Sequence, residues 1–190
     1  MMVPAMSEPG NATSPSAPTG PAPGSLVVHL GDHTIGVTMV GGGEWTLPLG
    51  VVSLVEGPLE RADRPRPEQL TNALGAVTDH LDDVVIESPI VGAAPAVTFA
   101  GIHAEMVGRV EMGVDELPAD YVLERADADD VFRTIVAEPR ADRAHNPGLD
   151  PEHVDTIIAG CCAVLAVLRR LDVQRADIDR TSVHQHEVRA

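Results

Sequence analysis

Residues 26–49 read LVVHLGDHTIGVTMVGGGEWTLPL, in which three short apolar runs are separated by glycine-containing turns. The runs 26–30 and 35–40 are rich in β-branched residues and are joined by a tight turn, so they predict a β-hairpin. The run 45–49 predicts a third strand, and Pro48 places it at a sheet edge or strand end because proline cannot donate a ladder hydrogen bond. The stretch therefore predicts a three-stranded meander.

The two clearest helix patterns lie further along the chain. Pro67 stands where a first helical residue is expected, and apolar residues then recur at helical spacing as far as Leu81. Residues 151–171 form the strongest pattern, with apolar side chains around most of the circumference. We expect a helix of that kind at the centre of the domain, buried on most sides.

Weaker signals fill the rest of the chain. We expect a buried strand within 84–91, a loop of small residues over 92–95, a helix over about 97–107, a helix capped by Asp127 and a last short strand over 173–178. A meander followed by helices and further strands predicts an α/β fold. Its order is that of a single ribonuclease-H-like half-domain of the actin/Hsp70 type, with a mixed sheet flanked by helices.

Both ends of the chain differ in composition from the middle. Residues 1–25 are rich in Pro, Ala, Gly and Ser and lack hydrophobic periodicity, so we expect a disordered tail there. Residues 181–190 predict a polar tail in which His184 and His186 are solvated, the alternative being a metal-binding pair. The domain itself is expected to span residues 26–180.

The chain is strongly acidic, because 13 Lys and Arg against 29 Asp and Glu give a formal net charge of −16. Such a field repels nucleic acids and anionic membranes, so we expect neither as a partner. No apolar run is long enough to span a bilayer, and the N-terminus lacks the regions of a secretory signal. The adjacent Cys161 and Cys162 are expected to be buried small hydrophobic residues, the alternative being a redox or metal role. Together these features predict a cytoplasmic protein.

Four blocks of the sequence resemble a known family. LPLGVVSL at 47–54, the segment 64–84 with its Pro-Glu helix start and DADDVF at 127–132 are similar to segments of the second domain of Ppx/GppA phosphatases. NPGLDPEHVDTIIAG at 146–160 resembles that family's PGL-x-P-E-R-A-D-x-I-x-A-G block and is the most specific of the four.

The resemblance implies an ASKHA-type half-domain from phosphatases that cleave terminal phosphates from polyphosphate or guanosine pentaphosphate. In that family two such domains face one another, and Mg²⁺ and a carboxylate supplied from the first domain act in the cleft between them. Because the sequence resembles the second domain only, the resemblance implies a separate first-domain protein or a homodimer as the partner.

The family's first phosphate loop in this domain is Asp-hydrophobic-Gly-Gly-Gly-Ser-Thr-Glu, and the matching residues 29–36 read HLGDHTIG. Asp32 puts a negative charge where the resemblance implies an anion, and His29 replaces the carboxylate that would organise Mg²⁺ through water. An alternative is that His29, Asp32 and His33 bind a metal, as opposed to being plain turn residues. The residues predicted to remain as ligands of this loop are Gly31, Asp32, His33 and Thr34.

The family's second loop, Gly-Thr-x-Thr at the start of a helix, is matched here by Pro95-Ala96-Val97-Thr98. Pro95 has no amide hydrogen to donate, and one of the two hydroxyls is absent. We predict that Gly92 and Thr98 remain as weak ligands of this second loop.

These departures favour a truncated, catalytically weak or inactive Ppx/GppA relative that acts as a binding or regulatory module. The alternative is an exopolyphosphatase or guanosine pentaphosphate phosphohydrolase that is active only with a partner domain or as a dimer. Phosphoryl transfer depends on positioning and charge neutralisation, and both are weakened by the rewritten loops. We assign no catalytic residue and no cofactor, with Mg²⁺ expected only if phosphohydrolase activity persists.

Overall fold

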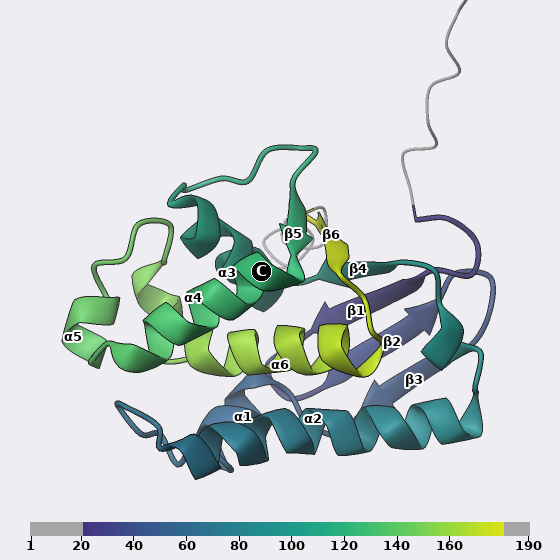
Figure 1. Cartoon of the computed structure of the whole chain (residues 1–190), viewed down its shortest axis with the longest axis horizontal. Helices are drawn as coiled ribbons and strands as arrows, with labels where there is room; N and C mark the ends of the chain where they lie inside the picture. Colours follow the sequence, from purple (N-terminus) through teal and green to yellow (C-terminus); the bar gives the residue numbers. More distant parts are fainter. Residues whose placement is uncertain (1–20, 181–190) are drawn as a thin grey trace, which may run out of the picture.

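The computed structural model describes residues 21–180, which form one six-stranded mixed sheet in the order β3-β2-β1-β4-β6-β5 (Figure 1). The strands are β1 (Leu26–Leu30), β2 (Ile35–Met39), β3 (Glu44–Leu47), β4 (Val97–Ala100), β5 (Val122–Glu124) and β6 (Arg175–Asp179). The helices are α1 (Val51–Glu56), α2 (Pro67–Glu87), α3 (Ile102–Met112), α4 (Arg125–Ala137), α5 (Arg140–Arg143) and α6 (Ile157–Arg170). Two 3₁₀ turns complete the set, η1 (Val91–Ala93) and η2 (Pro151–His153).

The predicted meander is confirmed. β1 pairs antiparallel with β2, and β2 pairs antiparallel with β3. On its other side β1 pairs parallel with β4, and β4 pairs parallel with β6, so the sheet is mixed. This arrangement, with helices packed on the sheet, confirms the predicted ribonuclease-H-like α/β fold.

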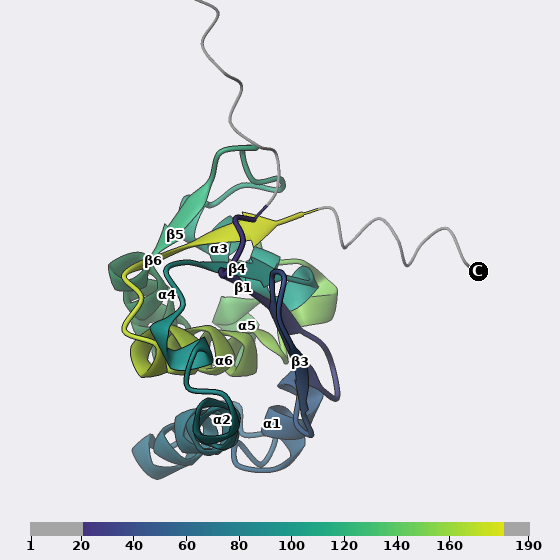
Figure 2. The ribbon, with the colours of Figure 1, turned by 90° about the vertical axis from the view of Figure 1, so that its right-hand side faces the viewer.

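Alternating burial along β1 shows which face of the sheet meets the core. Leu26, Val28 and Leu30 are at most 1% exposed, whereas Val27 is half-buried and His29 is exposed. Successive side chains of a strand point to opposite faces, so the buried set faces the helical layer. Figures 1 and 2 show α2 and α6 packed on that face.

The helix α6 is the centre of the core, as predicted. Every residue from Ile157 to Leu168 is buried, and α6 packs against α1, α2, α3 and α4. The chain itself therefore covers the apolar circumference of this helix, and no partner is required to bury it. The helix is shorter than predicted because residues 151–153 form η2 and the α-helix begins at Ile157.

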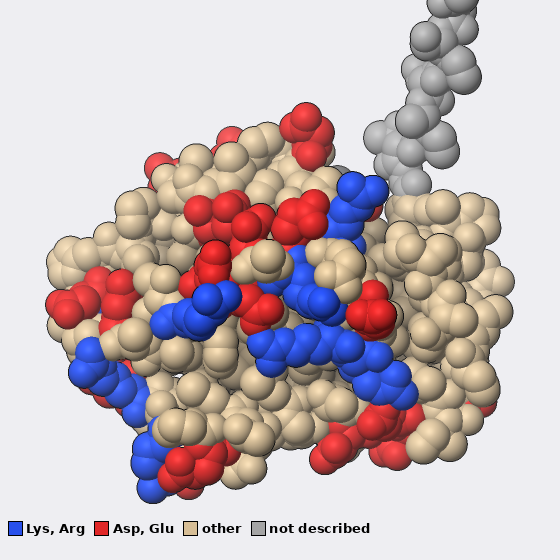
Figure 3. Space-filling view, viewed as in Figure 1, with Lys and Arg blue, Asp and Glu red and all other residues tan. Residues whose placement is uncertain are grey.

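Ion pairs on the surface tie α6 to its neighbours. Arg169 pairs with Asp129 of α4, and Arg170 pairs with Asp82 of α2. Arginine and acidic side chains accordingly lie side by side over these helices in Figure 3. Within residues 21–180, no helix has both the length and the apolar character needed to cross a membrane.

The strand predicted within 84–91 is wrong, because α2 continues to Glu87. Val77, Leu81 and Val84 lie on the buried face of that helix at helical spacing. Ile86 is 78% exposed, which a buried strand does not allow. A short apolar run such as 84–86 does not by itself distinguish the end of a long helix from a strand.

The helix predicted over 97–107 is also wrong at its start. Val97–Ala100 is the strand β4, buried at all four positions between β1 and β6. Gly101, with φ +95, ends the strand, and α3 begins at Ile102. A continuous apolar run carries no period that distinguishes a doubly buried strand from a helix.

Smaller differences concern short elements and helix ends. Glu124 occupies the N-cap position of α4 without a side-chain capping bond, and Asp127, the predicted cap, lies in the first turn of the helix. The sequence pattern missed α1, α5 and β5, which are six, four and three residues long. Elements of this length contain too few residues to show a period.

The folded part of the chain begins slightly earlier than predicted. Gly24 donates its amide to Val40, and Ser25 is 2% exposed, so these residues belong to the folded part. Residues 1–20 of the tail predicted over 1–25, and the whole tail predicted over 181–190 with His184 and His186, lie outside the described residues.

Candidate functional site

The carboxyl ends of β1 and β4 bring two turns side by side. The strands are parallel neighbours with His29 opposite Ala100, so both point to the same edge of the sheet. The turn after β1 runs from Gly31 to Thr34 and leads to β2. The turn after β4 is Gly101, which leads into α3. Parallel strands commonly place functional groups at this edge.

The first turn is fixed by backbone hydrogen bonds. Gly31 donates its amide to the Thr34 carbonyl at 3.0 Å, so this donor is used within the turn. The carbonyls of Gly31 and Asp32 accept from the amides of Val51 and Val52 at 3.0 and 2.8 Å. These two amides belong to the first turn of α1, whose own N-terminal donors would otherwise lack intrahelical partners. The start of α1 therefore fixes the turn.

The second turn needs a glycine. Gly101 has φ +95, a conformation that side chains other than glycine rarely adopt, and a Cβ there would lie 2.9 Å from the Leu30 carbonyl oxygen. Because the backbone at Gly101 approaches the backbone at Leu30 this closely, α3 begins directly beside the first turn. It also places His103, in the first turn of α3, next to the residues that follow β1.

Asp32 and His103 join the two turns. The Nε2 atom of His103 lies 2.8 Å from Oδ1 of Asp32, within hydrogen-bonding distance. The His103 side chain is 5% exposed and the Asp32 side chain is 63% exposed, so the contact lies at the boundary between core and solvent. A carboxylate at hydrogen-bonding distance from a largely buried imidazole fixes the orientation of the ring.

A second histidine packs on the first. The rings of His103 and His153 meet edge to face, with centroids 5.5 Å apart. Burial is the largest cause that lowers the pKa of His153 below its usual value, and the nearby His103 acts in the same direction. His153 is therefore neutral at pH 7. It stands at the arginine position of the PGL-x-P-E-R-A-D block.

An ion pair close to His153 holds the segment that carries it. Arg109 of α3 makes two hydrogen bonds of 2.9 Å to the two carboxylate oxygens of Asp150, the residue before η2. The Arg109 side chain is 9% exposed, and its buried Nε has no hydrogen-bond partner among residues 21–180. The pair ties the segment that carries His153 to the helix that carries His103.

The predicted ligand residues are only partly brought together. Gly31, Asp32, His33 and Thr34 share the first turn, and the last three are exposed. Thr98 lies within β4, opposite Val27 and Asp177, and is 9% exposed. It precedes the second turn rather than forming part of it, because the helix was predicted to begin too early.

Gly92 lies in η1, before the amino end of β4 and against Val85 of α2. The two turns lie beyond the carboxyl ends of β1 and β4, so Gly92 is at the opposite end of that strand. The wrong strand and helix boundaries account for its prediction as a ligand. The glycine that enters the helix is Gly101, which the sequence analysis did not single out.

The arrangement does not fit a magnesium site. Mg²⁺ in proteins is held by oxygen ligands, whereas Asp32 contacts an imidazole. Within the part of the chain that the structure describes, no group of three or more His, Cys, Asp or Glu side chains has the geometry of a metal site. Asp32, His103 and His153 together place one carboxylate and two imidazoles beside the two turns.

Comparison with known proteins bears on the fold. No family model and no curated protein matches the sequence. Among solved structures, an exopolyphosphatase-like protein shares 21% identity and a TM-score of 0.72, with 84% of this chain and 56% of that chain covered. A Ppx/GppA enzyme from Aquifex aeolicus shares 17% identity and a TM-score of 0.72, with 86% of this chain and 56% of that chain covered. An exopolyphosphatase from Cytophaga hutchinsonii shares 13% identity and a TM-score of 0.66, with 82% of this chain and 52% of that chain covered.

This chain thus spans little more than half the length of the proteins that it matches. The matched share is what the resemblance to one half-domain implies. At these identities the likeness concerns the fold. The chain has the fold of one half of a Ppx/GppA-type exopolyphosphatase.

Proposed function

We propose that this chain is a Ppx/GppA relative that has lost phosphohydrolase activity and acts as a binding or regulatory module. The observation that carries the proposal is the position of Asp32. Its carboxylate lies in the turn after β1 and contacts His103 in the turn after β4. A negative charge therefore lies in the turn after β1, the first of the loops to which the resemblance assigns phosphate.

The backbone of the turns supports the same conclusion. A phosphate cradle needs amide donors that point at the anion, and glycines that allow its close approach. In this chain the Gly31 amide bonds to Thr34 within the turn. The net charge of −16 adds a long-range repulsion for polyphosphate and nucleotides.

The direct test is an assay of phosphate release. The purified chain is incubated with Mg²⁺ and polyphosphate or guanosine pentaphosphate, and inorganic phosphate is measured over time. We expect no release above a protein-free control. Sustained release that Asp32→Asn abolishes, and that Asp79→Asn on an exposed part of α2 leaves unchanged, would contradict the proposal.

The charge argument can be tested in binding rather than turnover. Asp32→Asn removes the negative charge and keeps the shape of the side chain. If Asp32 excludes anions, the variant binds pyrophosphate more tightly than the natural chain in a titration at low salt. Equal affinity in the two proteins would show that Asp32 is not what prevents phosphate binding.

The second candidate is a phosphohydrolase that needs a partner half. It is favoured by the coverage of only 56% of the matched chain. Light scattering measures whether the protein forms a dimer, and the phosphate assay is repeated across a range of protein concentrations. Activity that rises with the dimer fraction supports this candidate, whereas a monomer that stays inactive with and without a separately expressed first domain excludes it.

A further inference from the structure

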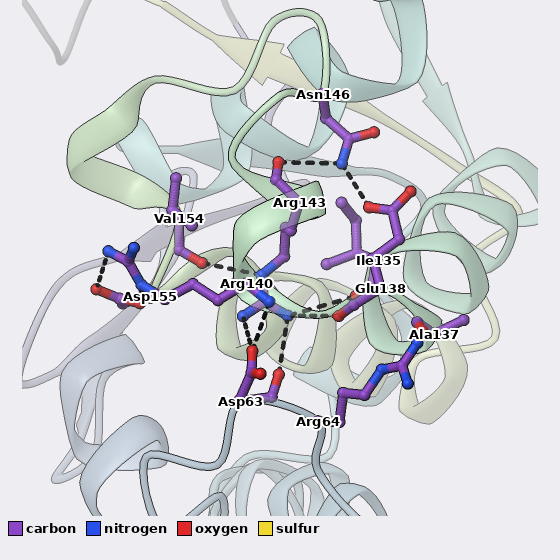
Figure 4. Close-up of polar contacts among 10 residues, drawn as sticks. All are labelled: Asp63, Arg64, Ile135, Ala137, Glu138, Arg140, Arg143, Asn146, Val154 and Asp155. Carbon is purple, nitrogen blue, oxygen red and sulfur yellow. Dashed lines mark hydrogen bonds and ion pairs between the residues drawn. The ribbon is translucent and has the colours of Figure 1, made fainter.

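A cavity of about 260 Å³ lies apart from the two turns, between the segment after α1, the helix α5 and the start of α6. Its apolar wall includes Val55, Leu59 and Ile158, of which the last two are 3% and 4% exposed. Its polar wall includes Arg140, Arg143 and Asp155 (Figure 4). Pockets that combine an apolar wall with a few fixed polar groups are the usual form of small-molecule sites.

Arg143 is the fixed polar group. Its side chain is 3% exposed, and two of its nitrogens donate to main-chain carbonyls of four residues, Asp63, Ile135, Glu138 and Val154, at 3.2–3.5 Å. Burial lowers the pKa of Arg143, but a guanidinium remains charged in proteins. The carbonyls hold the side chain in one orientation, as Figure 4 shows.

The third nitrogen, Nη2, has no comparable acceptor. Within residues 21–180, the acidic oxygen it pairs with is Oδ1 of Asp63 at 3.9 Å, which is beyond hydrogen-bonding distance. Asp63 is held elsewhere, because its Oδ1 accepts from the backbone amide of Arg140 at 2.5 Å. Arg143 thus lines the cavity with a nitrogen that makes no hydrogen bond of ordinary length to the residues of 21–180, and an anionic ligand can accept from it.

Arg140 supplies a second guanidinium at the mouth of the cavity. It makes two hydrogen bonds, of 2.5 and 2.9 Å, to Asp155, and the two side chains are 54% and 61% exposed. Exposed ion pairs of this kind contribute little to stability, so Arg140 can exchange Asp155 for a ligand at small cost. Arg143 and Arg140 therefore form a pair of donors, one fixed and one adjustable.

Charge and shape select the class of ligand. The lining contains three arginines, Arg61, Arg140 and Arg143, and two aspartates, Asp63 and Asp155, and Arg61 is itself paired with Glu56, so the local charges balance. A single negative charge disturbs this balance less than a phosphate dianion does. The fork of Nε and Nη2 that Arg140 now offers to Asp155 also matches a ligand carboxylate through parallel hydrogen bonds, to which Nη2 of Arg143 adds one more donor. The apolar wall and small volume require a short hydrocarbon tail.

We propose that this cavity binds a small amphipathic carboxylate. The carboxylate accepts hydrogen bonds from Arg143 and Arg140, and the tail packs against Val55, Leu59 and Ile158. No part of this site overlaps the turn that holds Asp32, so the proposal is independent of whether the chain hydrolyses phosphate.

The test is an NMR titration of the full-length ¹⁵N-labelled chain with 4-methylpentanoate. Its neutral counterpart 4-methylpentanamide and inorganic phosphate serve as matched probes. We expect saturable shifts at cavity residues such as Ala62 and Ile158, with a Kd on the order of 1 mM. The amide and phosphate are each expected to bind at least about tenfold more weakly, because the amide lacks the negative charge and phosphate lacks the hydrocarbon tail.

Variants separate this site from unspecific binding. Arg140→Gln is expected to weaken the carboxylate about tenfold, and Val55→Trp, which fills the cavity from a partly exposed position, is expected to abolish binding. Arg133→Gln, on the exposed surface of α4, is the matched control and should change nothing. The proposal is overturned by absence of saturable shifts, by equal binding of the amide or phosphate, or by equal binding to the Arg140→Gln and Arg133→Gln proteins.

Discussion

Asp32 and His103 are 71 residues apart in the chain, and the imidazole Nε2 of one lies 2.8 Å from the carboxylate of the other. The contact joins the turn after β1 to the start of α3, and so connects the meander to the second, helical part of the domain. A hydrogen bond to a charged group contributes about 1.5–3 kcal/mol when well shielded, and less when one partner is exposed. The contact is therefore expected to contribute to stability as well as to exclude anions.

A double-mutant cycle measures that contribution. His103→Ala is expected to lower the free energy of unfolding by about 2–3 kcal/mol, because it removes a buried ring and its hydrogen bond. Asp32→Ala is expected to cost about 1 kcal/mol, and the coupling between the two changes is expected to be about 0.5–1.5 kcal/mol. Urea unfolding gives all three values, with the exposed His33→Ala as a control near zero. Strictly additive effects would show that the contact carries no energy of its own.

Of the two turns at the site, the sequence predicts the first and not the second. The turn after β1 was predictable because β1 and β2 alternate in burial and are joined by a glycine-led turn. His103 was not, because its partner is distant in sequence and the helix that carries it was predicted to begin at Val97. Once β4 is known to end at Ala100, a histidine two residues after the following Gly101 becomes a visible candidate.

The length of an element decides whether the sequence predicts it. The helix α6 was predicted because a run of 14 residues shows its period and its burial together. The strand β4 has four residues, all buried, and shares its apolar composition with a helix core. Only tertiary contacts, here the pairing of β4 with β1 and β6, decide between the two.

Stability is expected to depend on pH through His153. Burial and the neighbouring His103 lower its pKa in the folded protein, whereas the unfolded chain titrates near 6.5. The unfolded state therefore binds the proton first, so stability from this group is complete above about pH 6.5 and is lost as the pH falls toward the lower, folded pKa. Urea midpoints at pH 7.5 and 5.5 measure the loss. His153→Gln should reduce the difference, and an unchanged difference would exclude His153 as its cause.

The turn between β4 and α3 provides a test of backbone conformation. Gly101→Ala is expected to destabilise the fold by about 1–3 kcal/mol, because φ +95 is strained for alanine and its Cβ meets the Leu30 carbonyl. Gly75→Ala, in the interior of α2 with open space around the new Cβ, is expected to stabilise by about 0.5–1 kcal/mol. Thermal unfolding of both variants gives the two signs. A neutral or stabilising Gly101→Ala would contradict the geometry of the turn.

The ion pair behind His153 is expected to matter more than those on the surface. Asp150→Ala leaves Arg109, with a side chain 9% exposed, without its carboxylate and should cost about 2–4 kcal/mol. Asp130→Ala removes an exposed pair with Arg133 and should change stability by less than about 0.5 kcal/mol. Chemical denaturation of the two variants compares them directly. Similar losses would mean that Arg109 finds another partner when Asp150 is absent.

The two cysteines give the last prediction, on the interior of α6. Cys161 and Cys162 are free and at most 1% exposed, and burial raises the pKa of Cys162 to about 12 and that of Cys161 still further above its usual value. Only the thiolate reacts with disulfide reagents, so both groups are expected to be inert in the folded protein at pH 8. In denaturant, both of the chain's two cysteines should react with Ellman's reagent. Rapid labelling of the native protein at either position would instead indicate local opening of α6 and would support the redox or metal interpretation of the pair.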